Sequence, residues 1–168
     1  MLKIIVTGPE SCGKTTLCTQ LAKHFKSKII SEYARNFITN LTRNYNQSDL
    51  LKIAKGQLSA ENINGNILFC DTDLITIKIW SLFKYKTCNN WIVHQIEKQK
   101  KEDRFYLLCR PDIPWQSDSQ RENQNNREEL FKLYKKELTE LDHDYFIVEG
   151  ENRRENAISK ISQIITAI

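Results

Sequence analysis

Several features are scarce or absent in this sequence of 168 residues. No stretch approaches the roughly 18 consecutive apolar residues of a membrane-spanning helix, and the first residues lack the pattern of a secretory signal peptide. The five cysteines are odd in number and widely spaced, and they form no Cys-x-x-Cys pair. Neither a disulfide framework nor a zinc site is therefore expected, and a reducing, cytoplasmic location is the simplest prediction.

A strong excess of charge of one sign is also missing. The chain has 25 Lys and Arg against 21 Asp and Glu, a net charge of +4. The most basic run, residues 98–104, is interrupted by Glu102 and Asp103, which is typical of a solvated face. We therefore expect a small-molecule partner, with no nucleic acid and no membrane. The length corresponds to a single domain.

Apolar segments of strand length alternate with segments of helical period. The predicted strands are Lys3–Thr7, Lys28–Ile30, Ile67–Asp71, Phe105–Cys109 and Tyr145–Glu149. Apolar residues recur at helical spacing at Leu17, Leu21 and Phe25, at Leu130, Tyr134, Leu138 and Leu141, and at Ile158, Ile161, Ile165 and Ile168. This alternation predicts an α/β fold over residues 1–168, with a doubly wound parallel sheet covered by helices on both faces. Ligands of such sheets bind beyond the carboxyl ends of the strands.

One motif after the first predicted strand is specific. Residues 8–15 read Gly-Pro-Glu-Ser-Cys-Gly-Lys-Thr and fit the pattern G-x-x-x-x-G-K-[ST] of a phosphate-binding loop, or P-loop. Its backbone N–H groups cradle phosphate oxygens, Lys14 reaches the β- and γ-phosphates, and Thr15 coordinates Mg²⁺. The predicted phosphate-binding residues are Gly8, Glu10, Ser11, Cys12, Gly13, Lys14, Thr15 and Thr16. The sequence thus predicts a site for ATP and Mg²⁺.

Motifs of nucleotide hydrolysis are missing. No N-K-x-D or T-K-x-D is present to select guanine, and no D-x-x-G follows a predicted strand. We expect Asp71, at the end of the third strand, to hold Mg²⁺, directly or through a water. A hydrolytic ATPase typically places a second carboxylate directly after this aspartate, whereas Thr72 stands there. Phosphoryl transfer to an acceptor hydroxyl is therefore favoured over hydrolysis.

Two acidic residues that could face a phosphoryl acceptor, Glu32 and Asp73, each have two interpretations. A phosphoryl acceptor needs a carboxylate to orient its hydroxyl and take its proton, and Glu32 follows the second strand. Alternatively, Glu32 is a helix N-terminal acid with Ser31 as the cap. Arg35 either pairs with Glu32 or touches a phosphate. Asp73 either contacts the sugar hydroxyls of the acceptor or caps the next helix.

Residues 111–127 form a polar segment with two prolines, almost no aliphatic residues and many Asn, Gln, Ser, Asp and Arg. Its position after the fourth strand favours a mobile lid over the site, although a plain surface loop has similar composition. Arg121 and Arg127 are candidates to close over the phosphates and stabilise the transition-state charge. Trp115 either stacks on a flat ring or pins the loop.

Taken in order, these motifs resemble the ribosylnicotinamide (nicotinamide riboside) kinase domain of the NadR-type NAD-biosynthesis proteins, a P-loop family related to AAA-domain ATP-binding proteins. The resemblance rests on the P-loop and on the motifs Glu32-Tyr33-x-Arg35, Ser48-Asp49, Ile53-Ala54-x-Gly56-Gln57, Asp71-Thr72-Asp73-x-Ile75-Thr76, and Trp115 before Arg121. It implies a five-stranded sheet, ATP–Mg²⁺ as the donor and a riboside 5′-hydroxyl as the acceptor. Glu32, Tyr33, Arg35, Asp73 and Trp115 would then face the substrate.

Two positions depart from the family pattern. Where the family has a nicotinamide-stacking Trp before the acid of the second strand, this chain has Ser31, and Lys84 replaces an aromatic residue on a later helix. The leading interpretation is a nicotinamide riboside kinase that depends on Lys14, Glu32 and Asp71. A kinase of another nucleoside, nucleotide or vitamin alcohol, and a non-catalytic ATP-binding regulatory module, remain alternatives.

Overall fold

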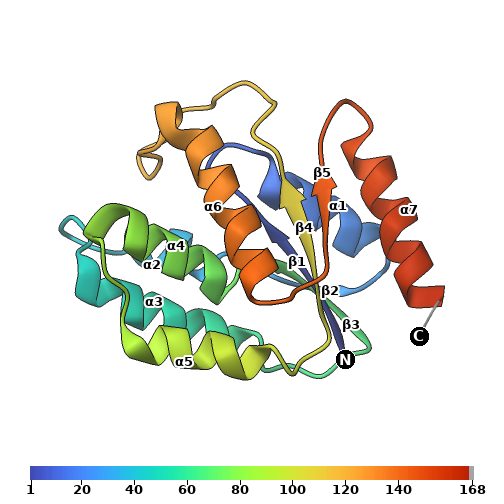
Figure 1. The fold of residues 1–168 in the computed structure, drawn as a ribbon, viewed down its shortest axis with the longest axis horizontal. Coiled ribbons are helices and arrows are strands. Elements are labelled where there is room, and N and C mark those ends of the chain that lie inside the picture. Colours follow the sequence, from blue (N-terminus) through green and yellow to red (C-terminus); the bar gives the residue numbers. More distant parts are fainter. Residues whose placement is uncertain (167–168) are drawn as a thin grey trace.

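The computed structural model of this chain describes residues 1–166. Five parallel strands form one sheet in the order β2-β3-β1-β4-β5, as Figure 1 shows. Their bounds are β1 Leu2–Thr7, β2 Lys28–Ile30, β3 Ile67–Asp71, β4 Arg104–Cys109 and β5 Tyr145–Val148. The predicted doubly wound α/β fold with helices on both faces is thereby confirmed.

Seven α-helices and one short 3₁₀ helix connect the described strands. They are α1 Lys14–His24, α2 Tyr33–Thr39, α3 Gln47–Ala60, α4 Leu74–Tyr85, α5 Asn90–Gln99, η1 Gln124–Asn126, α6 Arg127–Glu140 and α7 Arg153–Thr166. None of these helices is both long and apolar enough to cross a membrane. Ile168, the last residue of the predicted third helical stripe, lies outside the described residues.

The predicted strand bounds are correct to within one residue. The fifth strand ends at Val148 rather than at Glu149, because its ladder partner β4 ends at Cys109, which pairs with Val148. The side chain of Glu149 instead forms an ion pair with Arg110 at 2.6 Å.

Alternate residues of the central strands pack into two separate hydrophobic cores, one on each face of the sheet, as expected for a parallel sheet with both faces covered. Ile4 and Val6 of β1 pack with α1 and α7 on one face. Ile5, on the opposite face, belongs to a larger core made with helices α2 to α6. In Figure 1, α1 and α7 accordingly lie on one side of the sheet, and α3, α4, α5 and α6 lie on the other. The P-loop, Glu32 and Asp71 follow or end β1, β2 and β3, in that order. They therefore lie together at the carboxyl edge of the sheet.

Candidate active site

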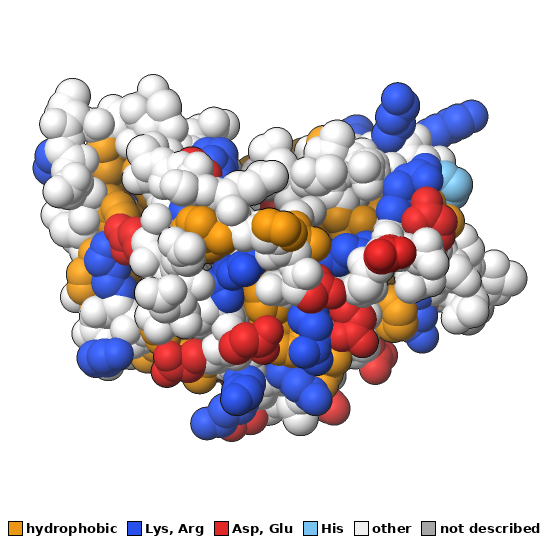
Figure 2. All heavy atoms as spheres, turned by 90° about the horizontal axis from the view of Figure 1, so that it is seen from above, with side chains coloured by type: hydrophobic (Ala, Val, Ile, Leu, Met, Phe, Trp, Pro, Cys, Tyr) orange, Lys and Arg blue, Asp and Glu red, His pale blue; other side chains and the backbone are white. Residues whose placement is uncertain are grey.

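A cavity of about 620 Å³ opens at the carboxyl edge of the sheet. The face seen from above in Figure 2 carries acidic and basic side chains interspersed with small apolar patches. All eight predicted phosphate-binding residues line the cavity, and three further candidates, Glu32, Arg35 and Arg121, line it as well. One enclosed volume therefore contains both the phosphate-binding loop and the candidate acceptor carboxylate.

The P-loop has the backbone geometry that its glycines predict. Gly8 has φ 134° and Gly13 has φ 81°, both in the region that favours glycine. A Cβ on Gly8 would lie 2.6 Å from the carbonyl oxygen of Cys109, so no other residue fits there without a shift. Lys14 begins α1 and donates a hydrogen bond to the Pro9 carbonyl oxygen at 2.6 Å. Its ammonium is thus held at the rim of the loop.

Buried charges of both signs face one another beside the loop. Burial raises the pKa of Glu32 above its ordinary value, opposed by the positive charges of Lys14 and Arg35 and reinforced by Asp71. Burial also raises the pKa of Asp71, against the opposing effects of the Thr15 hydroxyl and Lys14. Of the two, Glu32 lines the cavity and Asp71 does not. A carboxylate whose proton affinity is raised in a cavity is a good candidate for a proton acceptor, which favours Glu32.

Asp71 also has an unsatisfied atom. Its Oδ1 is buried without a hydrogen-bond partner among the described residues, and the nearby Thr15 hydroxyl lowers the pKa of Asp71 against the larger effect of burial. No cluster of three His, Cys, Asp or Glu side chains that could hold a metal ion occurs within residues 1–166. This donor set fits Mg²⁺, which is usually held by one or two protein groups together with phosphate oxygens and water.

The candidate lid lies across the cavity in this structure. Glu10 of the P-loop accepts hydrogen bonds from the backbone N–H groups of Glu122 at 3.0 Å and Asn123 at 2.8 Å. Ser11 accepts one from the Gln116 N–H at 2.8 Å. Residues 111–127 are therefore a covering segment that is bonded to the loop, and movement of that segment stays a prediction.

The two arginines of the lid have different surroundings. Arg121 lines the cavity and forms an ion pair with Asp118 at 3.0 Å. Arg127 does not line it, and instead donates to the carbonyl oxygens of Ser11 at 3.1 Å and Ile113 at 3.0 Å. Its guanidinium lies 5.7 Å from the ring centre of Trp115, which also does not line the cavity. Arg121 thus lies at the cavity, whereas Arg127 and Trp115 lie at the base of the lid, and the predicted roles of all three toward ATP or the substrate stay predictions.

Asp73 does not line the cavity, and the structure supports its alternative role as a helix cap. Its carboxylate is fully buried and accepts hydrogen bonds from the Ile75 N–H at 3.0 Å and the Tyr106 hydroxyl at 2.7 Å. Arg104 lies 3.4 Å from it and also pairs with Glu61. With its oxygens engaged beneath α4, Asp73 has no route to the acceptor in this geometry.

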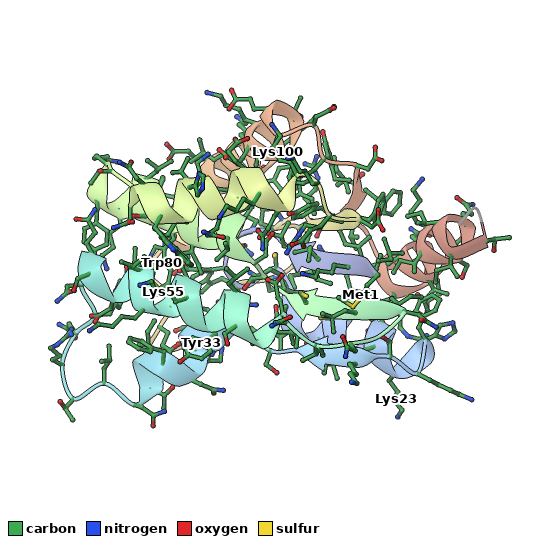
Figure 3. The ribbon with its side chains drawn as sticks, turned by 90° about the horizontal axis from the view of Figure 1, so that it is seen from below. Met1, Lys23, Tyr33, Lys55, Trp80 and Lys100 are labelled. Carbon is green, nitrogen blue, oxygen red and sulfur yellow. The ribbon has the colours of Figure 1, made fainter. Side chains whose placement is uncertain are left out.

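Tyr33 also points away from the cavity, and Figure 3 labels it at the start of α2. Its ring lies against Gly56 of α3, where a Cβ would come within 2.2 Å of it. The Tyr33 N–H donates to Gln57, and the Gln57 side chain donates to the Thr72 carbonyl oxygen. The Gly56-Gln57 motif thus joins the ends of β2 and β3, which carry Glu32 and Asp71.

Sequence reasoning missed the aromatic wall of the cavity. Trp80 and Phe83 of α4 line it together with Ile79 and with Ile38 of α2, and Figure 3 labels Trp80 on that side of the sheet. Their spacing along α4 was a usable signal, because positions 76, 79, 80 and 83 share one helix face. Ser31, by contrast, is exposed and does not line the cavity.

Arg153 at the start of α7 was also missed. It lines the cavity and donates to the carbonyl oxygens of Cys12 at 3.0 Å, Arg110 at 2.6 Å and Val148 at 3.0 Å. One guanidinium thereby ties the P-loop to the ends of β4 and β5. Basic residues in the turn after the fifth strand were its only signal in the sequence.

The fold and the loop geometry define an α/β P-loop nucleotide-binding protein. A family model described as "AAA domain" matches residues 3–155, so the chain belongs to that family.

The predicted similarity to NadR proteins is confirmed. The chain is 27% identical over 161 residues to the "Trifunctional NAD biosynthesis/regulator protein NadR" of Escherichia coli (strain K12), a match that covers 89% of this chain and 38% of the relative. This chain therefore corresponds to well under half the length of that relative.

Solved structures show the same fold. A NadR protein in complex with NR superposes with a TM-score of 0.75 at 24% identity, covering 96% of this chain and 51% of that one. A deoxyadenosine kinase from M. mycoides gives 0.62 at 15% identity, covering 99% of this chain and 100% of that one. A shikimate kinase from Acinetobacter baumannii gives 0.57 at 13% identity, covering 99% and 94%. The chain thus has the fold of P-loop kinases.

Proposed function

We propose that this protein is an ATP-dependent kinase that phosphorylates the 5′-hydroxyl of nicotinamide riboside, giving nicotinamide mononucleotide. The observation that carries the proposal is that Glu32 and the P-loop line one cavity under a common lid. Similarity to NadR over 89% of the chain supports the choice of acceptor.

The donor half of the cavity would hold the phosphates of ATP. The P-loop N–H groups and the N-terminus of α1 attract the phosphate oxygens. Lys14 would exchange its bond to the Pro9 carbonyl oxygen for the β- and γ-phosphates, and Arg121 would approach from the lid. Both cations stabilise the charge that builds on the transferred group.

Thr15 and Asp71 are the residues that would hold Mg²⁺. When bound, this ion neutralises charge on the β- and γ-phosphates. The unpartnered Oδ1 of Asp71 supports this role, because a buried carboxylate oxygen without a partner carries a free-energy cost that a cation or its water shell removes.

Glu32 would accept the proton of the acceptor hydroxyl. Its side chain is 25% exposed and lies 3.8 Å from Arg35, so an acceptor in the cavity can reach it. Because burial raises the pKa of Glu32, its carboxylate takes up a proton more readily than an ordinary surface glutamate. Proton removal by a positioned base of this kind contributes about 10²–10⁴-fold to rate.

The aromatic wall fits the ring of the acceptor. The nicotinamide ring of the riboside is flat and positively charged, and indole and phenyl rings attract such cations. Trp80 and Phe83 line the same cavity as Glu32. They offer this contact in place of an aromatic residue at Ser31.

A kinase of another nucleoside, nucleotide or vitamin alcohol is the second candidate. The observation that favours it is that the chain departs from the family pattern at both positions. Ser31, at the stacking position, is exposed, and the Lys84 ammonium is paired with Glu122. An apolar and aromatic wall also accepts other flat rings.

The test is ADP release from Mg²⁺–ATP with and without nicotinamide riboside, followed by mass detection of the product and by a panel of other ribosides and alcohols. Stimulation by nicotinamide riboside, with a product heavier by one phosphate, supports the proposal. Stimulation by a different acceptor alone transfers it to the second candidate. Tight ATP binding without stimulation by any acceptor indicates the regulatory module instead.

A further inference from the structure

One lid residue, Glu122, is bonded both to the P-loop and to two side chains beside the aromatic wall of the cavity. Its backbone N–H donates to Glu10 of the P-loop at 3.0 Å. Its carboxylate reaches the acceptor side, where it accepts hydrogen bonds from the Tyr45 hydroxyl at 3.0 Å and from the Lys84 ammonium at 2.9 Å. Glu122 also directly follows Arg121, which lines the cavity.

The acceptor-side contacts converge on the Tyr45 hydroxyl. It is bonded to Glu122 and to Lys84, and it accepts the indole N–H of Trp80 at 3.1 Å. The Tyr45 and Trp80 rings meet edge to face with centres 4.8 Å apart, and the Lys84 ammonium lies 4.0 Å from the centre of the Tyr45 ring. The wall of the acceptor half is therefore linked to the lid through two side chains, Tyr45 and Lys84.

We propose that Glu122, Tyr45 and Lys84 form a latch and that all three are positioning residues. The latch holds Arg121 over the P-loop only when the lid is bonded both to the P-loop and to the side chains beside the aromatic wall. None of the three lines the cavity, so each acts through the lid and not on the reacting atoms. The catalytic part of this inference rests on the proposed kinase function, whereas the lid contact itself does not.

The proposal explains the substitution at position 84. A lysine there replaces the aromatic residue of the family pattern and forms an ion pair with the lid. The Lys84 and Glu122 side chains are 34% and 43% exposed, so the ion pair alone contributes little and is screened by salt. The shared hydroxyl of Tyr45 is what makes the three groups one unit.

The first test measures the lid without requiring catalysis. An arginine-specific endoprotease cleaves after Arg121 and Arg127, and a closed lid slows this cleavage. Cleavage after Arg127, whose neighbouring residues none of the variants changes, is the readout. Tyr45→Phe keeps the ring but removes the hydroxyl, and we expect cleavage to become about threefold to tenfold faster, the factor that the loss of one hydrogen bond gives. Lys84→Glu places two carboxylates together and should also accelerate cleavage, whereas Lys132→Glu, the same change of charge on the exposed face of α6, should not.

A charge swap separates the latch from general loss of structure. In the double variant Lys84→Glu with Glu122→Lys, the pair is rebuilt with reversed signs, and slow cleavage should return. In wild type, added NaCl should accelerate cleavage, and in Lys84→Glu it should not. Wild-type cleavage rates in Tyr45→Phe and in Lys84→Glu, or no recovery in the swap, would overturn the latch.

The second test uses turnover with the acceptor that the substrate panel identifies. Tyr45→Phe and Lys84→Glu should lower kcat more than they raise the KM of ATP, and the swap should recover kcat. Unchanged kcat alongside faster cleavage would remove the positioning role. If no acceptor supports turnover, the kinase proposal fails by itself, while the cleavage pattern still decides whether the latch exists.

Discussion

Replacing Glu32 by Gln tests the central step of the proposed reaction. The substitution keeps the size and hydrogen-bonding capacity of the side chain but removes its ability to take a proton. We expect kcat to fall by about 10²–10⁴-fold, the range for loss of a general base, which corresponds to about 3–5 kcal/mol of transition-state stabilisation. The Kd of ATP should remain unchanged, because the phosphates bind to the P-loop.

The structure supplies a matched control for this change. Arg35 lies 3.8 Å from Glu32 and 3.3 Å from Asp118, so Glu32→Gln leaves the guanidinium with one acidic partner. Asp118→Asn removes the other acid and leaves the candidate base in place. Because it also removes the partner of Arg121, the loss it shows is an upper limit for the effect of releasing Arg35. If the effect of Glu32→Gln came only from releasing Arg35, the two variants would lose similar activity. We expect a large loss only in Glu32→Gln.

The pH dependence gives an independent check on Glu32. Because burial raises its pKa above the ordinary value of 4.5, the acidic limb of kcat/KM should lie above that value in wild type and should vanish in the Gln variant. The contribution of Glu32 to the pH dependence of stability has the opposite sign to that of a carboxylate with a lowered pKa. The folded state binds the proton more tightly, so ionisation costs stability as pH rises from the unfolded to the folded pKa.

Glu32→Gln should therefore match or exceed the Tm of wild type at pH 7 while losing activity. These quantities are measured by a coupled ADP assay over a range of pH and by thermal melting. An unchanged kcat, or an acidic limb that survives in Glu32→Gln, would refute the assignment of Glu32 as the base.

Three further substitutions probe the rest of the site. Lys14→Met should lower kcat by about 10²-fold or more, since it removes a cation from the transferred phosphate, and a Tm well below that of wild type would count against this explanation. Gly8→Ala should abolish ATP binding measured by calorimetry, because its Cβ would lie 2.6 Å from a backbone carbonyl oxygen; retained affinity would contradict the geometry of the loop. Asp73→Ala leaves the buried Tyr106 hydroxyl without its acceptor and Arg104 with Glu61 as its buried partner, and should cost about 1–3 kcal/mol in urea unfolding, whereas a stable variant with lost acceptor binding would restore the sugar-binding role.

Local patterns in the sequence were sufficient for the architecture. Five strand-length segments alternating with helical stripes predicted the parallel sheet to within one residue at each strand boundary. The three central strands were the clearest, because burial on both faces demands continuous apolar strands. The P-loop was equally legible, since its glycines and Lys14 are required by backbone geometry and charge within eight consecutive residues. Such features can be recognised in the sequence because they depend on residues that lie close together along the chain.

The roles of residues whose partners are distant along the chain could not be predicted from the sequence in this way. The motif around Asp73 allowed two roles, and only the tertiary structure shows its carboxylate bonded to Tyr106, 33 residues away. Arg153 is bonded to the P-loop carbonyl of Cys12, 141 residues away. No pattern among neighbouring residues in the sequence indicates such contacts.

The sequence by itself determined the fold class and the phosphate-binding loop, because each follows from periodicity or from spacing within a short segment. It left Glu32 open between a base and a helix N-terminal acid. The tertiary structure decided which polar groups meet. It placed Glu32 in the same cavity as the P-loop, withdrew Asp73 into the core, and brought Trp80 to the cavity wall. The physical reason is that a side chain's chemistry is set by burial and by neighbours, and both are properties of the packed chain.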